Sequence, residues 1–495
     1  MPASWTRLCS EHALGLQLPP GATAPLEAFA GGREATSADF AVLLEESRRV
    51  AGELPKRIRS ALDGEVDAQQ AAMFARRFAD VRAQLVAIPG DEALLLEVGL
   101  VQRTAEVLAA SAPRALRVRA VADFFYSHAG LLHHRPAPGQ PAPPTVAERV
   151  GRARWSAVGP GVWWARVAGI TDQGPVHLNL LRVRAAQLVA VDCRGRGSLV
   201  EVAAQEGAVA AISGGFFLYS EPDIAPPSRR GDPVGLLVTG GQVRGLPAWR
   251  RSALVQRDDG SMAIEVLGME DVTVRWPGGE VRAVATNDLG RLGEGPVAFN
   301  RAFGPRAPSR PGFAMVGREV VAHGVGLAIP LAGCVVVDPG TRPPRGGVEV
   351  VIAGRQAAMA GGPRILTEGR VRLDLGAEQF AGTAPPITFS QDETFDQNLL
   401  PRMAAGLTAE GELVVAAVDG RNFDAALGMT LRQTAGVLAS LGCVEALNLD
   451  GGSSKRMVVA GEVVDLPSTE VVAGGGGSAR VRPVHSAILF RPLSE

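Results

Sequence analysis

The pattern of apolar and polar positions divides the chain into two parts with different periodicity. Between residues 37 and 131 apolar residues recur at helical spacing. In one segment they stand at steps of four, three and four: Phe74, Phe78, Val81 and Leu85. Asp91 can cap a following helix, and a third helix is expected over about 114 to 129. The pattern predicts a helical N-terminal domain over residues 1–134, built as a small bundle.

A proline-rich segment, RPAPGQPAPPT, separates this part from the rest of the chain. Its five prolines cannot sustain a helix or a central strand, so we interpret residues 135–149 as a semi-rigid linker. The tract GGGGS at 474–478 predicts a flexible loop.

From residue 150 to residue 495 the sequence pattern predicts mainly β-strands. Short apolar runs alternate with glycine and proline turns: VHLNLLRVR, LVAVDCR, AVAAISGGFF, GLLVTGG, CVVVDPG, VEVVIAG, ELVVAAVDG, CVEALNLDGG and SAILFRP. The clearest helix is GMTLRQTAGVLASLG at 428–442, where Thr430 and Gln433 form a capping box and Gly442 supplies the stop. We therefore predict an α+β chain, in which the helical bundle precedes a β-rich mixed-sheet domain containing a βαβ unit.

The βαβ unit is expected at 412–452. ELVVAAVDGR forms a strand that ends at Asp419, the capped helix follows, and CVEALNLDGG forms a second strand that ends at Asp450. Such a unit is a right-handed parallel crossover, so both aspartates should lie at the carboxyl ends of neighbouring strands. Ligand sites in open α/β sheets favour that edge.

Glycine turns and arginines follow or precede other strands of this part. They comprise Ser213, Gly214 and Gly215 followed by Phe216 and Phe217; Gly361, Gly362 and Arg364; Arg402 and Arg421; and Asn448, Gly451, Gly452, Ser453 and Ser454. Paired glycines can turn main-chain N–H groups toward an anion, arginine forks bind phosphate, and a carboxylate can transfer protons or attack. Each motif alone is more often an ordinary turn or a solvated charge. Together they favour a phosphate-bearing substrate.

Composition narrows the class of function. A net charge of −1 and a pI of about 6.7 give no electrostatic case for nucleic acid or an anionic membrane. The four cysteines are far apart, which argues against a zinc site or a disulfide framework. The N-terminus lacks the pattern of a signal peptide and no apolar run is long enough to span a bilayer, so we expect a cytoplasmic protein. The sequence does not indicate an oligomeric state.

Seven motifs occur in an order that resembles the phosphodiester glycosidase family: ISGGFF, AGGPRIL, LPRMAAGL, VVAAVDGR, GMTLRQTAGVLASLG, ALNLDGGSS and RPVHSAILF. The resemblance covers about 160–492. It implies a hydrolase that cleaves the glycosidic bond of a sugar-1-phosphodiester, such as an N-acetylglucosamine-1-phosphodiester or a cell-wall glycan, and releases sugar and a phosphomonoester.

The resemblance also implies roles for individual residues. It makes Asp450, Asp419 and Arg402 the catalytic candidates and assigns the glycine turns, Phe216, Phe217, Arg364, Arg421, Asn448, Ser453 and Ser454 to substrate binding. Which aspartate is nucleophile or base stays open. Five positions depart from the family pattern and put the substrate in doubt: Ser213, Met403, Lys455, His485 and Ser486.

The expected partner is a small-molecule or glycan phosphodiester. The motifs require no cofactor and no metal, although they leave room for a divalent cation near Asp450. The alternative is a non-catalytic glycan or cell-wall binding protein, which would keep the phenylalanines and glycine turns without needing aspartates and arginines together. A phosphodiesterase that cuts P–O bonds would usually use two metal ions and a His/Asp cluster, and this sequence has no such cluster.

Overall fold

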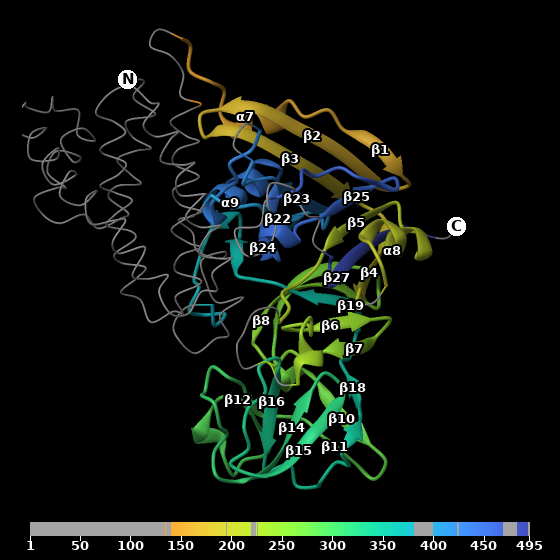
Figure 1. The fold of residues 1–495 in the computed structure, drawn as a ribbon, viewed down its shortest axis with the longest axis vertical. Coiled ribbons are helices and arrows are strands. Elements are labelled where there is room, and N and C mark those ends of the chain that lie inside the picture. Colours follow the sequence, from red (N-terminus) through yellow and green to blue (C-terminus); the bar gives the residue numbers. More distant parts are fainter. Residues whose placement is uncertain are drawn as a thin grey trace, which may run out of the picture.

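The structure is a computed structural model, and it describes residues 134, 140–194, 196–218, 224, 226–380, 399–422, 425–468 and 483–493. The predicted N-terminal bundle, the first part of the predicted proline-rich linker (135–139) and the GGGGS tract lie outside these residues. In the described part, strands dominate, and they form four sheets (Figure 1).

The first sheet is the one that positions the site. In spatial order its eight strands are β1 (Ser156–Gly159), β2 (Val162–Thr171), β3 (Gly174–Val183), β23 (Leu413–Val418), β22 (Arg402–Thr408), β24 (Cys443–Leu449), β20 (Arg364–Thr367) and β21 (Arg370–Val371). Every neighbouring pair is antiparallel. Helices α7 (Val146–Gly151) and α9 (Leu431–Ser440) share a core cluster with one face of this sheet.

A second sheet contributes to the core on the opposite face of the first. Its five strands are β26 (Glu462–Val463), β25 (Met457–Val459), β5 (Ala210–Ser213), β27 (Ser486–Pro492) and β4 (Ala186–Asp192). Helix α8 (Leu199–Gln205) packs on its far side, where Leu199 and Val202 are buried. The central residues of this sheet, such as Ile212 and Ile488, have no exposed surface.

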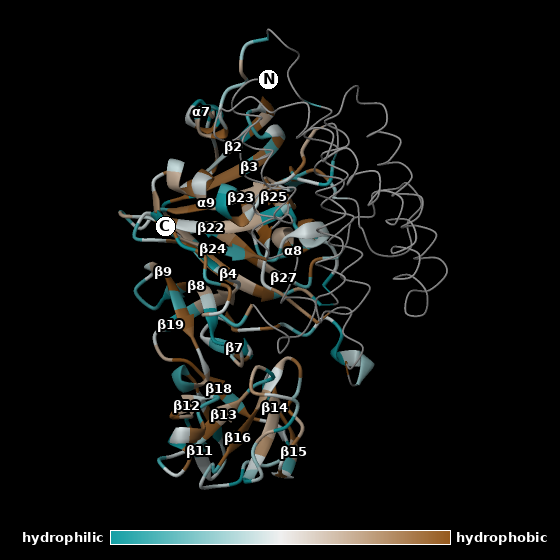
Figure 2. Cartoon of the chain, turned by 90° about the vertical axis from the view of Figure 1, so that its left-hand side faces the viewer, coloured by the Kyte–Doolittle hydropathy of each residue, from teal (hydrophilic) through white to brown (hydrophobic). Residues whose placement is uncertain are grey.

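The third and fourth sheets form the lower half of the molecule in Figure 1. The third contains β11 (Gly279–Val281), β10 (Thr273–Trp276), β18 (Glu349–Val351), β7 (Gln242–Gly245), β6 (Leu237–Thr239), β19 (Arg355–Ala360), β8 (Arg251–Arg257) and β9 (Met262–Leu267). The fourth contains β12 (Ala285–Thr286), β13 (Val297–Phe299), β16 (Gly333–Val337), β14 (Pro311–Val316), β15 (Glu319–Val325) and β17 (Gly346–Gly347). One apolar core joins these two sheets, and Figure 2 shows hydrophobic colour along strands such as β13 and β16.

The predicted capped helix is confirmed as α9. The Thr430 hydroxyl accepts a hydrogen bond from the Gln433 amide, and the Gln433 side chain accepts one from the Thr430 amide. The predicted apolar stripe of Leu431, Ala435, Leu438 and Leu441 is buried. Gly442 ends the helix with φ +92°, a left-handed conformation that glycine adopts without steric cost.

The predicted fold class is wrong for the described residues. They hold three α-helices, none longer than ten residues, and large antiparallel sheets, so this part is mostly β rather than α+β. Residues 37–131, where the bundle was expected, lie outside the described part, and no helical bundle occurs within it. None of the three described helices is long and apolar enough to cross a membrane. The domain boundary predicted at residue 150 falls inside α7.

Candidate active site

Two predicted catalytic aspartates and one arginine come to the same edge of the first sheet. Strands β23 and β24 run in the same direction, because β22 lies between them and is antiparallel to both. Arg402 pairs with Val418 and Met403 pairs with Leu449. The start of β22 therefore lies beside the ends of β23 and β24, where Asp419 and Asp450 follow. The prediction that the strands ending at Asp419 and Asp450 are neighbours is wrong, since β22 separates β23 from β24.

Side-chain alternation sends these groups to different faces of the edge. Asp419 continues the row of Val415 and Ala417, which belong to the core shared with the second sheet. Arg402 continues the row of Ala404, which packs toward α9, and its Nε donates to the Met429 carbonyl at 3.0 Å. The site therefore has a carboxylate on one face of the sheet and a guanidinium on the other.

Asp419 is held from several sides. Its Oδ2 lies 2.5 Å from Nδ1 of His177 and 3.5 Å from the Asn179 amide nitrogen, both on the neighbouring strand β3. Its Oδ1 accepts hydrogen bonds from Lys455 Nζ and, at 3.1 Å, from the Leu466 amide. The Asp419 side chain has no exposed surface, whereas the His177 side chain keeps 11%. The carboxylate is saturated with donors, and the imidazole is the more accessible member of the pair.

Lys455 extends this contact into a buried chain of ion pairs. Its Nζ also lies 2.7 Å from Asp465 Oδ2, which accepts from Arg456 Nη1 at 3.0 Å. Asp465 Oδ1 accepts from the Met457 amide at 2.6 Å. The Lys455 side chain is fully buried. Because an unpaired buried charge is costly, each member of this chain requires the next.

Asn448 and Asp450 end strand β24. The Asn448 side-chain nitrogen donates to the Gly362 carbonyl at 3.1 Å, while Oδ1 is buried and has no hydrogen-bond partner among the described residues. An acceptor left in this state is uncommon and suits a ligand donor such as a sugar hydroxyl. Asp450 is 7% exposed, and its amide donates to the Gly214 carbonyl at 3.0 Å. That bond connects the edge of the first sheet to the end of β5.

The glycine turns bring main chains into close contact. Gly214 and Gly215 donate to the Ser486 carbonyl and hydroxyl, at 2.8 and 3.1 Å. Gly361 and Gly362 donate to the carbonyls of Ser252 and Asn448, at 2.9 and 2.7 Å. A Cβ on Gly215 would lie 2.2 Å from the Ala360 carbonyl oxygen. We predicted that these N–H groups bind a phosphate. In the structure they donate hydrogen bonds to other residues of the protein instead.

The glycine-serine motif that follows Asp450 forms a short 3-10 turn, η5 (Gly452–Ser454). Ser453 and Ser454 in this turn are each 5% exposed. Gly452 donates to the Pro401 carbonyl at 2.9 Å, and a Cβ on Gly451 would lie 2.6 Å from the same oxygen. The turn is thus packed against the residue that precedes Arg402. The predicted binding residues of this motif lie at the same edge as Arg402.

The remaining predicted residues are distributed differently. Phe216 enters the lower core and packs edge-on against Phe380, whereas Phe217 lies 4.0 Å from the His485 ring, centroid to centroid. Ser213 ends β5, and its hydroxyl accepts from the Arg456 amide. Arg421 follows Asp419 directly and is 1% exposed.

Arg364 is directed away from the edge. Its guanidinium donates to the Ile264 carbonyl at 2.6 Å and lies 3.4 Å from Glu445. Glu445 stands five residues before Asp450 on β24, which is roughly 16 Å at the rise of a strand. The segment FSQDETFDQN offers two further candidate carboxylates, Asp392 and Glu393, and both lie outside the described residues.

Sequence reasoning missed His177, the pairing of Lys455, and Asp465. His177 stands between Val176 and Leu178 in an apolar strand, so it resembles a core histidine, and it is 242 residues away from Asp419. The departure of Lys455 from the family pattern was the one available signal for the ion-pair chain. Within the described ranges, no group of three or more His, Cys, Asp or Glu side chains is arranged to hold a metal ion.

Comparisons with known proteins place this edge in context. The family model for phosphodiester glycosidases matches residues 311–491. No curated protein matches the chain.

The solved structures that are similar to this chain include two at low identity. A hypothetical protein from Synechocystis is 22% identical with a TM-score of 0.44; the match covers 68% of this chain and 63% of that protein. The catalytic domain of zebrafish N-acetylglucosamine-1-phosphodiester alpha-N-acetylglucosaminidase, auto-inhibited by its pro-peptide, is 14% identical with a TM-score of 0.41; the match covers 71% of this chain and 96% of that domain. This chain thus spans less than two thirds of the Synechocystis protein.

The matched span begins after the ISGGFF motif but contains Arg402, Asp419, Asn448, Asp450 and Lys455. The resemblance of this chain to phosphodiester glycosidases is therefore confirmed, over residues 311–491.

Proposed function

We propose that this protein hydrolyses the glycosidic bond of a sugar-1-phosphodiester and releases a free sugar and a phosphomonoester. One observation carries the proposal: a buried Asp419–His177 pair and Asp450 stand at the same sheet edge as Arg402. Asp419, Asp450 and Arg402 lie inside the span that matches phosphodiester glycosidases. Carboxylates are the usual groups of glycosidases, and guanidinium groups suit a phosphate.

Asp419 acts as a positioning residue. Both of its oxygens accept hydrogen bonds from buried donors, so an attack on an anomeric carbon would break an ion pair as well as hydrogen bonds. Its hydrogen bond to Nδ1 of His177 fixes the imidazole tautomer with Nε2 as the free proton acceptor. His177 then takes the proton of the attacking water or returns it, as a general base and acid.

Asp450 is the carboxylate that acts at the sugar. It lies across β22 from Asp419, where it can stabilise or attack the positively charged anomeric carbon. Asn448, two residues earlier on the same strand, presents the buried Oδ1 described above to a sugar hydroxyl.

The phosphate is held by Arg402 and Arg421. Between residues 402 and 465 the described part buries four cationic side chains, Arg402, Arg421, Lys455 and Arg456, and three aspartates, Asp419, Asp450 and Asp465. These buried residues have one more positive than negative charge, and a bound phosphate would supply negative charge to balance it. A phosphomonoester is already a good leaving group, so guanidinium charge replaces much of the work of a general acid. Arg364 has no place in this clamp because Glu445 and Ile264 hold its guanidinium.

The test is a panel of sugar-1-phosphodiesters and cell-wall phosphoglycans incubated in water enriched in oxygen-18. Cleavage of the C–O bond places the heavy oxygen in the released sugar. Heavy oxygen in the phosphate would show P–O cleavage and overturn the proposal. A protein that binds these compounds and never releases reducing sugar would instead be a glycan-binding protein.

A further inference from the structure

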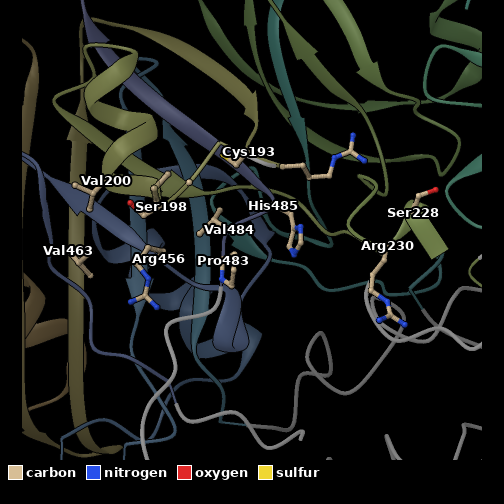
Figure 3. Close-up of a pocket in the computed structure, with 13 residues that line it drawn as sticks. Cys193, Ser198, Val200, Ser228, Arg230, Arg456, Val463, Pro483, Val484 and His485 are labelled. Atoms are coloured by element: carbon tan, nitrogen blue, oxygen red, sulfur yellow. The ribbon is translucent and has the colours of Figure 1, made fainter. Parts of the chain in front are cut away.

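Two adjoining hollows lie beside the second sheet, each about 770 Å³ in volume. The first opens between the start of α8, the residues before β27, and Arg456 (Figure 3). The second runs from Asp192 to Arg318, at the border of the second, third and fourth sheets. They share Arg194 and Ser228 on their walls, and we name the two adjoining hollows together the arginine groove.

The groove has a strong excess of positive groups. The first hollow is lined by Arg194, Arg230, Arg456 and His485, and no carboxylate is present among its described lining residues. In Figure 3 Arg230 and Arg456 stand on opposite sides with His485 between them. Such a wall attracts anions.

The carboxylates of the second hollow are already paired. Arg194 contacts Asp192 at 2.5 Å and also Asp232, and these contacts hold the pKa of Arg194 above its ordinary value. Arg229 lies 2.6 Å from Glu319. Arg194 is thus a fixed cation on the shared wall, and no carboxylate of this hollow is left to pair with the other arginines.

Three arginines of the groove point to solvent. Arg230, Arg244 and Arg318 are exposed, and their side chains make no hydrogen bond or ion pair with any residue that the structure describes. Each is therefore able to offer its guanidinium fork to a phosphate, which it can bind in a bidentate manner.

The groove begins next to the candidate active site. Arg456 lines the first hollow and binds Asp465, which binds Lys455, the partner of Asp419. His485, also on this wall, packs against Phe217 of the ISGGFF motif. A short chain of direct contacts thus joins the groove to the sheet edge.

We propose that the arginine groove binds a phosphate-rich continuation of the substrate, so that the preferred substrate is a glycan or polyol chain with further phosphate groups beyond the bond that is cleaved. The proposal rests on the proposed function for the identity of that bond. A nucleic acid is disfavoured because the described walls contain no Phe, Tyr or Trp on which bases could stack.

The first measurement is binding and needs no turnover. The full chain is titrated with a short linear inorganic polyphosphate, and the triple variant Arg230→Gln, Arg244→Gln and Arg318→Gln is compared with the parent. We expect Kd to rise about tenfold or more, and the slope of log Kd against log salt to fall by about 2, because three contacts are lost at about 0.7 each. A matched control replaces three exposed arginines far from the groove, Arg152, Arg154 and Arg370, with glutamine.

Equal Kd and equal salt slope in the two triple variants would overturn the proposal. So would a single-stranded oligonucleotide of the same charge that binds more tightly than polyphosphate.

The second measurement uses two sugar-1-phosphodiesters, one with a neutral alkyl group and one whose chain carries two more phosphates. The groove variant should lose its preference for the charged chain, at an unchanged kcat/KM for the neutral one. If the protein binds polyphosphate through the groove but cleaves neither compound, the proposed function fails and the groove assignment stands. If it cleaves both with no preference for charge, the groove assignment fails and the proposed function stands.

Discussion

Two regions of this chain differ in the number of charged side chains that they bury. In the fourth sheet and its connections, residues 285–347, no charged side chain that the structure describes is buried; Asn300 is the one buried polar residue. Between residues 402 and 465, by contrast, seven charged residues are buried: Arg402, Asp419, Arg421, Asp450, Lys455, Arg456 and Asp465.

The difference shows where the fold contains buried charges that apolar residues could have replaced. Removal of a charge from water is expensive, and a buried ion pair often stabilises a fold no more than apolar residues of equal size would. The fourth sheet shows that this chain can build a sheet with an apolar interior. The charges at the edge of the first sheet are therefore better explained by chemistry than by stability.

The largest expected effect is that of Asp450→Asn on catalysis. Loss of the carboxylate at the sugar should lower kcat by about 10⁴-fold, which corresponds to about 5.5 kcal/mol, while the fold is kept. Steady-state release of reducing sugar measures the change, and circular dichroism checks the fold. A D450N protein with full turnover would remove Asp450 from the mechanism.

Lys455→Met should have the next largest effect, on stability. It leaves Asp419 and Asp465 buried without their cationic partner, and we expect the free energy of unfolding to fall by about 4 kcal/mol. Urea unfolding measures it. Exposed Arg282→Met is the matched control, since it also replaces a long cation with methionine. A K455M protein as stable as the parent would show that the ion-pair chain is not required.

The Asp419–His177 pair should act as a unit in catalysis. His177→Gln and Asp419→Asn are each expected to lower kcat by about 10²-fold, about 2.7 kcal/mol, and the double variant should lose little more than either single variant. The kcat of the parent and of each variant is measured at several pH values. Loss of a positioning residue should also shift the dependence of kcat on pH. Fully additive losses would show that the two residues work independently.

Val336→Ala in β16 probes the apolar region. Val336 is 1% exposed in the core between the third and fourth sheets, so we expect a loss of about 2 kcal/mol in stability. The KM and kcat of the folded variant should be unchanged. A large change in kcat at full stability would contradict the division of roles between the two regions.

The smallest effect is expected from the cap of α9. Thr430→Ala removes the acceptor for the Gln433 amide and should lower stability by about 1 kcal/mol. Thr430→Ser, which keeps the acceptor, should recover most of it. Chemical denaturation distinguishes the two, and an alanine variant as stable as the parent would show that the cap does not contribute.

Local features of the chain could be predicted from sequence because their causes are local. The nine apolar runs form strands, and Thr430 and Gly442 mark helix α9, since alternation, caps and glycine stops act over a few residues. The positions of Arg402, Asp419 and Asp450 at strand ends followed from the same patterns.

Long-range pairing could not be predicted in the same way. Nothing in the sequence around β22 shows that it inserts between β23 and β24, and nothing around His177 shows that β3 pairs with β23. The fold class was wrong for the described residues because it rested on the helical pattern at 37–131, which lies outside them, and on one crossover unit taken as a sign of a mixed sheet. The strands of that unit are in fact antiparallel to β22, which lies between them. The sequence could not show that carbonyl and hydroxyl oxygens of the protein accept the N–H groups of Gly214, Gly215, Gly361 and Gly362, which were predicted to bind a phosphate.

The complete burial of Lys455 has a practical consequence. The chain has two lysines, Lys56 and Lys455, and the amine of Lys455 has no exposed surface. Amine-directed reagents such as succinimidyl esters can therefore modify this position only when the sheet edge opens. The rate of acylation at Lys455, read by peptide mass spectrometry, reports breathing of the catalytic centre with almost no competing background.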